Sequence, residues 1–540
     1  MSPERLFRAL FLLPLMLNKL NKICVMLLLP VFFSPAGDAF AQVWHQQRNN
    51  ELFNTRSGSA SPSASYSNPT SDWHSVIAGW NYENGAFHRP DAPSGKSEMD
   101  IGVEELQSVG RFRTAGSIRY RNTREFDRNW NSLIGNDPDN PYVICDSLSD
   151  RSVTELFDIH GALSWSFGSG WVVGGSVALK TGTLSDIRDP RPRNDISRIP
   201  VSFGIERPVG DIWTLGVFGG AELFRSDFRY YLEDGQKVYR YYKMKGMGDF
   251  FAFSSSDSST APREYSGITW TGGINALADY GQTVNFVEIV FDSGKEDARD
   301  GGSSYEWKAG DYSHMQFKLT DRLDIKKQLV HSISLTADFK MREGYWYDQK
   351  RSVDTEHGNR TYFEVKSRYL NNEAFRLRAG GSYRVSSPDS WSAVLNAGVC
   401  MENDTHYTDG DPHVQSWNLL ELSASGWKTF LIGKHILDIS AGAGYVLPLG
   451  EPSYDSGNSA PAKEDISEWY VAPAFAYETS ARISAFIRAD WVMPASQGGK
   501  LRPGLFAKGS ILRQTGAALQ SPSLEGTDYC AMSAGAFLNF

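Results

Sequence analysis

Apolar and polar side chains alternate along most of this chain, which predicts long β-strands. From Phe157 to Phe167 every second residue is apolar or glycine, and the residues between them are Asp158, His160, Ala162, Ser164 and Ser166. The same alternation recurs over 313–320, 332–341 and 482–491. Successive side chains of a strand point to opposite faces, so each segment is expected to have one apolar and one polar face.

The predicted strands are longer than those of ordinary soluble sheets. Strands of soluble proteins are typically about 5–6 residues long, whereas these patterns run for about 10 residues or more, as in tilted membrane-spanning strands. After residue 42 the longest nearly uncharged apolar run is Trp171–Leu179, which is too short for a spanning helix of roughly 20 residues. Alternation alone is compatible with a membrane barrel and with a large soluble all-β protein.

The connections between strands favour the barrel. Short turns alternate strictly with longer polar stretches, as in outer-membrane barrels with short periplasmic turns and long extracellular loops. We expect turns near 109–110, 168–170, 208–211, 281–282, 324–328, 386–390, 432–434 and 480–481, and loops at 85–96, 125–153, 185–197, 228–262, 296–308, 344–359, 405–412, 448–465 and 494–525. This pattern predicts a single closed antiparallel transmembrane β-barrel of about 18 strands, within a range of roughly 14–20 because 360–385 fits one strand or two.

The last strand carries the most specific pattern. One face holds alternating residues up to the end of the chain, namely Met532, Ala534, Ala536, Leu538 and Phe540. Here the sequence resembles bacterial outer-membrane β-barrel proteins, in which a terminal aromatic after alternating hydrophobic residues is read by the barrel assembly machinery. The resemblance implies insertion by that machinery, although Met532 stands where an aromatic is common. Residues 187–194 look like those of uncharacterised Bacteroidota barrels, a narrower resemblance that implies no activity.

The N-terminus is expected to be an export signal. Lys19 and Lys22 precede an apolar run, and Ala39-Phe40-Ala41 fits a cleavage site, so residues 1–41 are interpreted as a signal peptide that starts at Met1 or Met16. Residues 42–72 are expected to form a periplasmic N-terminal tail or a small plug, and their low apolar content favours the tail. Residues 73–540 are assigned to the barrel.

The net charge and the cysteine content limit which partners and cofactors are expected. Without residues 1–41 the chain has 50 basic and 61 acidic residues, a net charge of −11, which argues against nucleic acid as a partner. Cys145, Cys400 and Cys530 are too widely spaced for a disulfide framework or a zinc site, and we expect no cofactor. The expected partners are outer-membrane lipid, lipopolysaccharide, the assembly machinery and a small polar or amphipathic solute.

Charged residues on the polar faces are the first candidate functional residues. We expect them to line the lumen and to filter solutes electrostatically, because the interior of such barrels is polar. These candidates are Asp158, His160, Lys180, Asp338, Lys340, Arg482, Arg488 and Asp490.

Loop 228–262 is unusually rich in aromatic residues. Its candidates for solute binding are Tyr230, Tyr231, Tyr239, Tyr241, Tyr242, Phe250 and Phe251. Because aromatic surface is costly to leave in water, we expect the loop either to fold over the pore as a solute site or to pack on neighbouring loops.

Two other chemistries are considered and not adopted. Residues 136–140 and 409–411 carry oxygen ligands at calcium-like spacing, but both sets are incomplete and consist of ordinary turn formers, so no metal site is expected. Asp158 with His160, and His314 with Lys318, share strand faces without a recognisable catalytic motif, so no enzyme is expected. The predicted function is a passive pore or solute transporter, and the alternative is a non-conducting assembly, adhesion or surface-binding protein.

Overall fold

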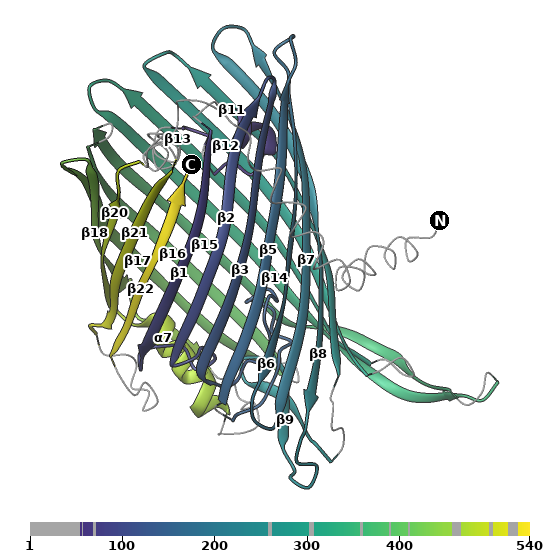
Figure 1. Cartoon of the computed structure of the whole chain (residues 1–540). Helices are drawn as coiled ribbons and strands as arrows, with labels where there is room; N and C mark the ends of the chain where they lie inside the picture. The colour runs from purple at the N-terminus through teal and green to yellow at the C-terminus, as the bar shows by residue number, and fades with distance from the viewer. Residues whose placement is uncertain are drawn as a thin grey trace, which may run out of the picture.

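Long strands form one closed antiparallel barrel (Figure 1). The computed structural model describes residues 54–56, 58–67, 72–148, 150–256, 262–301, 307–356, 360–387, 390–408, 411–455, 466–495, 501–516 and 527–540. Within these ranges the barrel has 18 strands, and β1 pairs with β22 to close it. The predicted fold class and strand number are therefore confirmed. The expected signal peptide lies outside the described residues.

Each barrel strand pairs with its neighbours along the chain. The strands are β1 (Trp73–Gly85), β2 (Gly95–Val109), β3 (Phe112–Arg128), β5 (Asp150–Ser166), β6 (Val172–Asp186), β7 (Arg191–Val209), β8 (Trp213–Tyr231), β11 (Arg263–Asp279), β12 (Thr283–Asp300), β13 (Trp307–Lys326), β14 (Val330–Asp354), β15 (Arg360–Ser387), β16 (Trp391–Thr408), β17 (Asp411–Ile432), β18 (His435–Pro448), β20 (Arg482–Val492), β21 (Arg502–Gln514) and β22 (Asp528–Asn539). A short strand, β19 (Ser453–Asp455), adds to β17.

The two faces of the wall differ as the alternation predicts. On β5, Phe157 and Ile159 are 44% and 42% exposed on the outward face, whereas Asp158 between them pairs with Arg121 on the inward face. Because a closed sheet satisfies its backbone hydrogen bonds internally, it can present an apolar outer surface. None of the described helices is long and apolar enough to cross a membrane.

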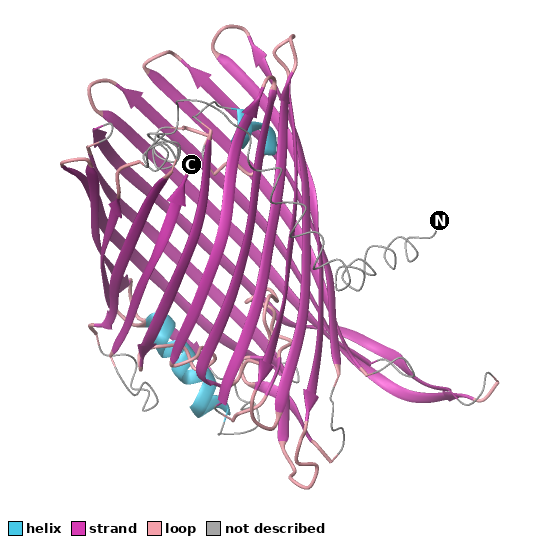
Figure 2. Cartoon of the chain, in the orientation of Figure 1, coloured by secondary structure: helices cyan, strands magenta, loops and turns pink. Residues whose placement is uncertain are grey.

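Helices lie near both ends of the barrel (Figure 2). Helix α5 (Pro62–Ser67) packs against β5, β6 and β7, and η2 (Ser467–Val471) continues into α7 (Ala472–Thr479) near the other end. The strand expected between the loop at 448–465 and the turn at 480–481 is therefore wrong, because this stretch is helical. Pro473 lacks the amide hydrogen that a central strand needs but is tolerated in the first turn of a helix, and Ala472, Ala474 and Ala476 favour a helix.

A second error offsets the first. The expected loop 494–525 contains β21, on which Leu505 and Ile511 are exposed while Phe506 and Lys508 occupy the alternate face. One expected strand is a helix and one strand, β21, was not expected, so the total number of strands is unchanged.

Several polar stretches expected as loops are continued strands. β16 extends to Thr408 and β17 begins at Asp411, so little remains of the expected loop 405–412. The open question at 360–385 is resolved as one strand, β15. Within the described residues, Trp346–Asp354 of β14 and Arg360–Tyr369 of β15 pair only with each other. These residues, which we call the ribbon, project beyond the barrel wall (Figure 1).

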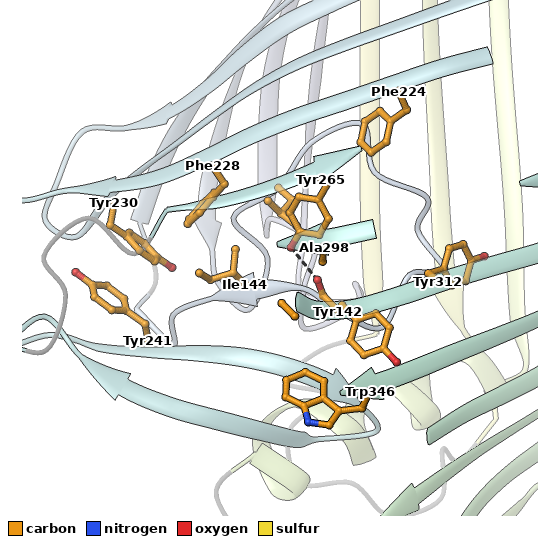
Figure 3. Close-up of a cluster of buried hydrophobic side chains, with 12 residues drawn as sticks. Tyr142, Ile144, Phe224, Phe228, Tyr230, Tyr241, Tyr265, Ala298, Tyr312 and Trp346 are labelled. Atoms are coloured by element: carbon orange, nitrogen blue, oxygen red, sulfur yellow. Dashed lines mark hydrogen bonds between the residues drawn. The ribbon is translucent and has the colours of Figure 1, made fainter. Parts of the chain in front are cut away.

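A small sheet and two buried clusters cover the end of the barrel that carries the longer loops. The sheet consists of β4 (Ile144–Cys145), β9 (Arg240–Gly246) and β10 (Asp249–Ser254). Figure 3 shows the larger cluster, in which the Tyr265 hydroxyl donates to the Tyr142 carbonyl at 2.7 Å. The small sheet is thereby fixed to the barrel wall by an apolar core of its own.

Candidate functional site

Residues 129–148, which we call the inner loop, fold into the lumen from the long-loop end. The Arg198 guanidinium on β7 donates to the Gly135 carbonyl at 2.6 Å, and the Asn140 amide donates to Glu296 on β12 at 2.9 Å. The Ile134 amide donates to Asn194 at 2.8 Å. These bonds attach the loop to inward-facing residues of separate strands, so it crosses the interior instead of extending away from it.

Two carboxylates of the inner loop meet basic residues of the wall. Asp139 lies 2.7 Å from the Lys340 ammonium, 2.8 Å from the Arg342 guanidinium and 3.0 Å from that of Arg376. Asp137 lies 3.1 Å from the same ammonium. Four buried or half-buried ion pairs thus hold the loop against β14 and β15.

The electrostatics of this network favour the charged form of Asp139. Burial alone would raise the pKa of Asp139, but Arg342, Lys340 and Arg376 outweigh it and hold the pKa well below its ordinary value. Arg342 also pairs with Glu402 and, at 2.7 Å, with Asp404. The loop is therefore bound to the wall by alternating charges.

A second titratable group of the inner loop has the opposite tendency. Burial raises the pKa of Asp146 to about 6, although hydrogen bonds from the Leu148 amide and the Tyr230 hydroxyl lower it. The Asp146 side chain is 6% exposed. Its charged form is therefore destabilised at neutral pH, in contrast to that of Asp139.

A cavity of about 770 Å³ lies between the inner loop, the helix η2–α7 and the wall. We call it the chamber. Its aromatic lining includes Trp130, Trp417 and Tyr470, and its charged lining includes Arg378 and Glu421. Charged side chains thus make up much of the chamber lining, with aromatic side chains between them.

Residues 54–56 and 58–67, which we call the strap, lie in the opposite end of the lumen. Arg56 pairs with Glu206 at 2.8 Å, Thr55 donates to Asp324 at 2.6 Å, and the Ala60 amide donates to Glu288 at 3.0 Å. All three acceptors are inward-facing carboxylates on the barrel strands. A Cβ at Gly174 would lie only 2.5 Å from the backbone of the strap, so a glycine there permits the close approach.

The predicted lumen candidates occupy inward positions around the wall and do not form one site. Asp158 pairs with Arg121, Lys180 lies opposite Asp158, and His160 follows on the same face of β5. Asp338 accepts a hydrogen bond from Gln316 at 2.8 Å, and Lys340 binds the inner loop. Arg482 donates to the Tyr477 carbonyl at 2.9 Å, and Arg488 pairs with Asp490 at 2.7 Å. Of these eight, Arg482 borders the chamber.

The predicted aromatic residues of loop 228–262 pack mainly on one another. Tyr230 and Tyr241 are fully buried in the cluster of Figure 3, with Tyr239 packed against it. Tyr242 and Phe250 belong to a second cluster around Trp130. The remaining two, Tyr231 and Phe251, are exposed. None of the seven borders the chamber in the described residues.

The C-terminal residues form the closing strand of the barrel. Met532, Ala534, Ala536 and Leu538 lie on one face of β22 and pair with β1. The Phe540 ring stacks on His74 with centroids 5.5 Å apart.

Two of the aspartates with calcium-like spacing have basic side chains as partners. Asp137 and Asp139 pair with basic side chains, and Asp409 and Gly410 lie outside the described residues. Across the described ranges, no three His, Cys, Asp or Glu side chains are grouped so as to hold a metal ion.

Most residues around the chamber were not predicted from the sequence. Arg342 follows Lys340 at the next inward position, and Arg376 with Arg378 repeats that spacing on β15. Charge recurring at period two near the long-loop end of a strand would have identified them. Their partners on the inner loop come from far away in the sequence, and no local pattern indicates such a pairing.

Comparison with known proteins identifies the family. The model of the "Family of unknown function (DUF6850)" matches residues 62–540. No curated protein matches the chain. Similar solved structures include the RagAB peptide transporter (7% identity, 87% of each chain, TM-score 0.39) and the FrpB iron transporter from Neisseria meningitidis (10% identity, 87% of this chain and 82% of the other, TM-score 0.39). The chain therefore belongs to the DUF6850 family.

Proposed function

We propose that this protein spans the bacterial outer membrane and conducts a small polar solute through its lumen. The outward face of the wall supports the membrane placement, because large apolar side chains such as Phe203, Trp270 and Leu335 are more than half exposed (66%, 59% and 55%). A closed barrel is one of the two structures that satisfy every backbone hydrogen bond in hydrocarbon. By the usual asymmetry of such barrels, the long-loop end is extracellular and the short-turn end is periplasmic.

The chamber is the observation that carries the proposal. A barrel that serves only as a support can fill its interior with side chains, whereas this one encloses about 770 Å³ bordered by charged and aromatic groups. A second cavity of about 690 Å³ is bordered by Asp100, Arg119 and Lys508, inward-facing residues of other strands. Two polar cavities support a solute path along the lumen.

The inner loop and the strap imply that conduction is gated. The inner loop partly covers the lumen on the extracellular side, and the strap occupies part of the periplasmic side. Movement of either element would widen the path. The sequence offers no nucleotide-binding motif, so transport would be diffusive or driven by a gradient.

Conductance of the purified protein in planar bilayers tests this function. We compare the wild type with a variant that lacks residues 54–67, and we use Lys366→Gln, an exposed position on the ribbon, as the control. We expect the strap deletion to increase single-channel conductance and the control to match the wild type. If neither the wild type nor the deletion variant conducts, the pore function is refuted.

A second function, binding of a partner at the cell surface, is favoured by the ribbon. Its residues Val353, Tyr362 and Val365 are 49%, 46% and 42% exposed, and an isolated two-stranded ribbon is only marginally stable in water. Deletion of residues 348–366 would leave conductance unchanged and abolish attachment to a surface partner if the ribbon has this role.

A further inference from the structure

Two of the charged residues that border the chamber, opposite in sign, have no ion-pair partner in the described part of the chain. Arg378 and Glu421 lie on the inward faces of β15 and β17 and are exposed to the lumen. Among the described residues neither forms an ion pair within 4 Å, whereas the neighbouring Arg342 and Arg376 are both paired with carboxylates. These two groups are therefore available to a solute.

The strand register fixes how far apart they are. Arg378 pairs with Cys400, Cys400 pairs with Leu419, and Glu421 lies two residues further along β17. Two strand spacings of about 4.8 Å and two residues of about 3.4 Å place their Cα atoms about 12 Å apart. Both residues line the chamber, so their side chains border the same space.

The chemistry of Arg378 and Glu421 indicates which groups a ligand should carry at its two ends. A guanidinium is a planar donor that matches a carboxylate in a bidentate geometry, and a carboxylate accepts from an ammonium. An extended peptide spans about 3.3–3.6 Å per residue, so three residues carry an ammonium and a carboxylate about 10 Å apart. A single amino acid carries both charges on one carbon and a neutral sugar carries neither, so a tripeptide matches two separated groups of opposite charge better.

We propose that the chamber binds short linear peptides, with the carboxyl end on Arg378 and the amino end on Glu421. This inference rests on the proposed conduit function and names its solute class. The half-buried Trp417 lines the same chamber and provides apolar surface for the peptide side chains. The volume of about 770 Å³ accommodates three residues with their hydration.

Calorimetric titration with trialanine tests the proposal. The peptide is used in its free form, with an acetylated amino end, and with an amidated carboxyl end. On the wild type we expect each blocked end to weaken binding by about tenfold, the effect of losing one charge-assisted contact of about 1.4 kcal/mol.

Substitutions in the chamber identify which end each group binds. Arg378→Gln is expected to lose sensitivity to amidation only, and Glu421→Gln to lose sensitivity to acetylation only. Arg229→Gln, an exposed arginine on the outward face of β8, is the matched control and is expected to bind as the wild type does.

The outcomes separate this inference from the proposed function. If the wild type binds all three peptides equally, the inference is overturned, and this test requires no substitution. Conduction without any peptide binding also overturns it. End-specific losses in a protein that does not conduct would support the peptide site and refute the conduit.

Discussion

The strength of the inner-loop attachment is tested by Asp139→Asn. The substitution keeps the size of the side chain but removes the charge that three cations share at 2.7, 2.8 and 3.0 Å. Each charge-assisted hydrogen bond contributes about 1.5–3 kcal/mol. Because Lys340 keeps Asp137, and Arg342 keeps Glu402 and Asp404, only part of the sum is lost. We expect closure of the inner loop to weaken by about 3 kcal/mol, or about 150-fold in its opening equilibrium.

Hydrogen exchange of the inner-loop amides measures this opening. Asp211→Asn, at an exposed position in the short turn between β7 and β8, is the matched control. Exchange in the inner loop is expected to accelerate in Asp139→Asn while exchange in the strands is unchanged. Unchanged exchange in the inner loop would refute the view that these ion pairs hold it closed.

The pH dependence follows from the lowered pKa of Asp139. A carboxylate whose folded pKa lies below its unfolded value stabilises the closed loop fully above the ordinary value of 3.8, and this contribution is lost only as the pH falls through the lowered pKa. The contribution of Asp139 to closure of the inner loop should therefore be constant from pH 8 down to about pH 4. The difference between the wild type and Asp139→Asn should persist throughout that range.

Three further predictions concern the strap, Asp146 and a glycine of the wall. Arg56→Gln leaves Glu206 buried without its partner and should accelerate hydrogen exchange in the strap, whereas the double variant with Glu206→Gln should restore protection. Because the pKa of Asp146 is raised, the stability of the wild type should fall as the pH rises from about 4 to about 6. Asp146→Asn should therefore be more stable than the wild type by up to about 3 kcal/mol at pH 8, and equally stable at pH 4. Thermal unfolding at the two pH values measures the difference. Gly310→Ala places a Cβ 2.6 Å from a buried tyrosine ring at a φ of +147° and should lower the unfolding free energy by more than about 2 kcal/mol, whereas Gly272→Ala, with open space, should have a much smaller effect.

The strands were predictable because their signal is local. Alternation on β5 and β13 depends only on which face each residue occupies, and the closing strand could be recognised from Phe540 backwards. The helix at 467–479 was not predicted because its apolar residues also fit a strand, and Pro473 is the local signal against a central strand.

The chamber was not predictable in the same way. Asp139 stands in a stretch of ordinary turn formers, and its meaning comes from Arg342 and Arg376, which lie more than two hundred residues further along the chain. Alternation along a strand indicates which residues face the lumen, but it does not indicate which of them lie close together. Only the closure of the barrel brings those strands to one cavity.

The seam between β1 and β22 also constrains how the molecule is built. Ser75 in the first barrel strand pairs with Asn539 in the last, so this pairing cannot form until β22 has been synthesised. Until β22 has been made and has paired with it, β1 presents an unpaired edge of the kind that favours aggregation with other chains. A chain without β22 would leave β1 unpaired on that side, and the sheet would stay open.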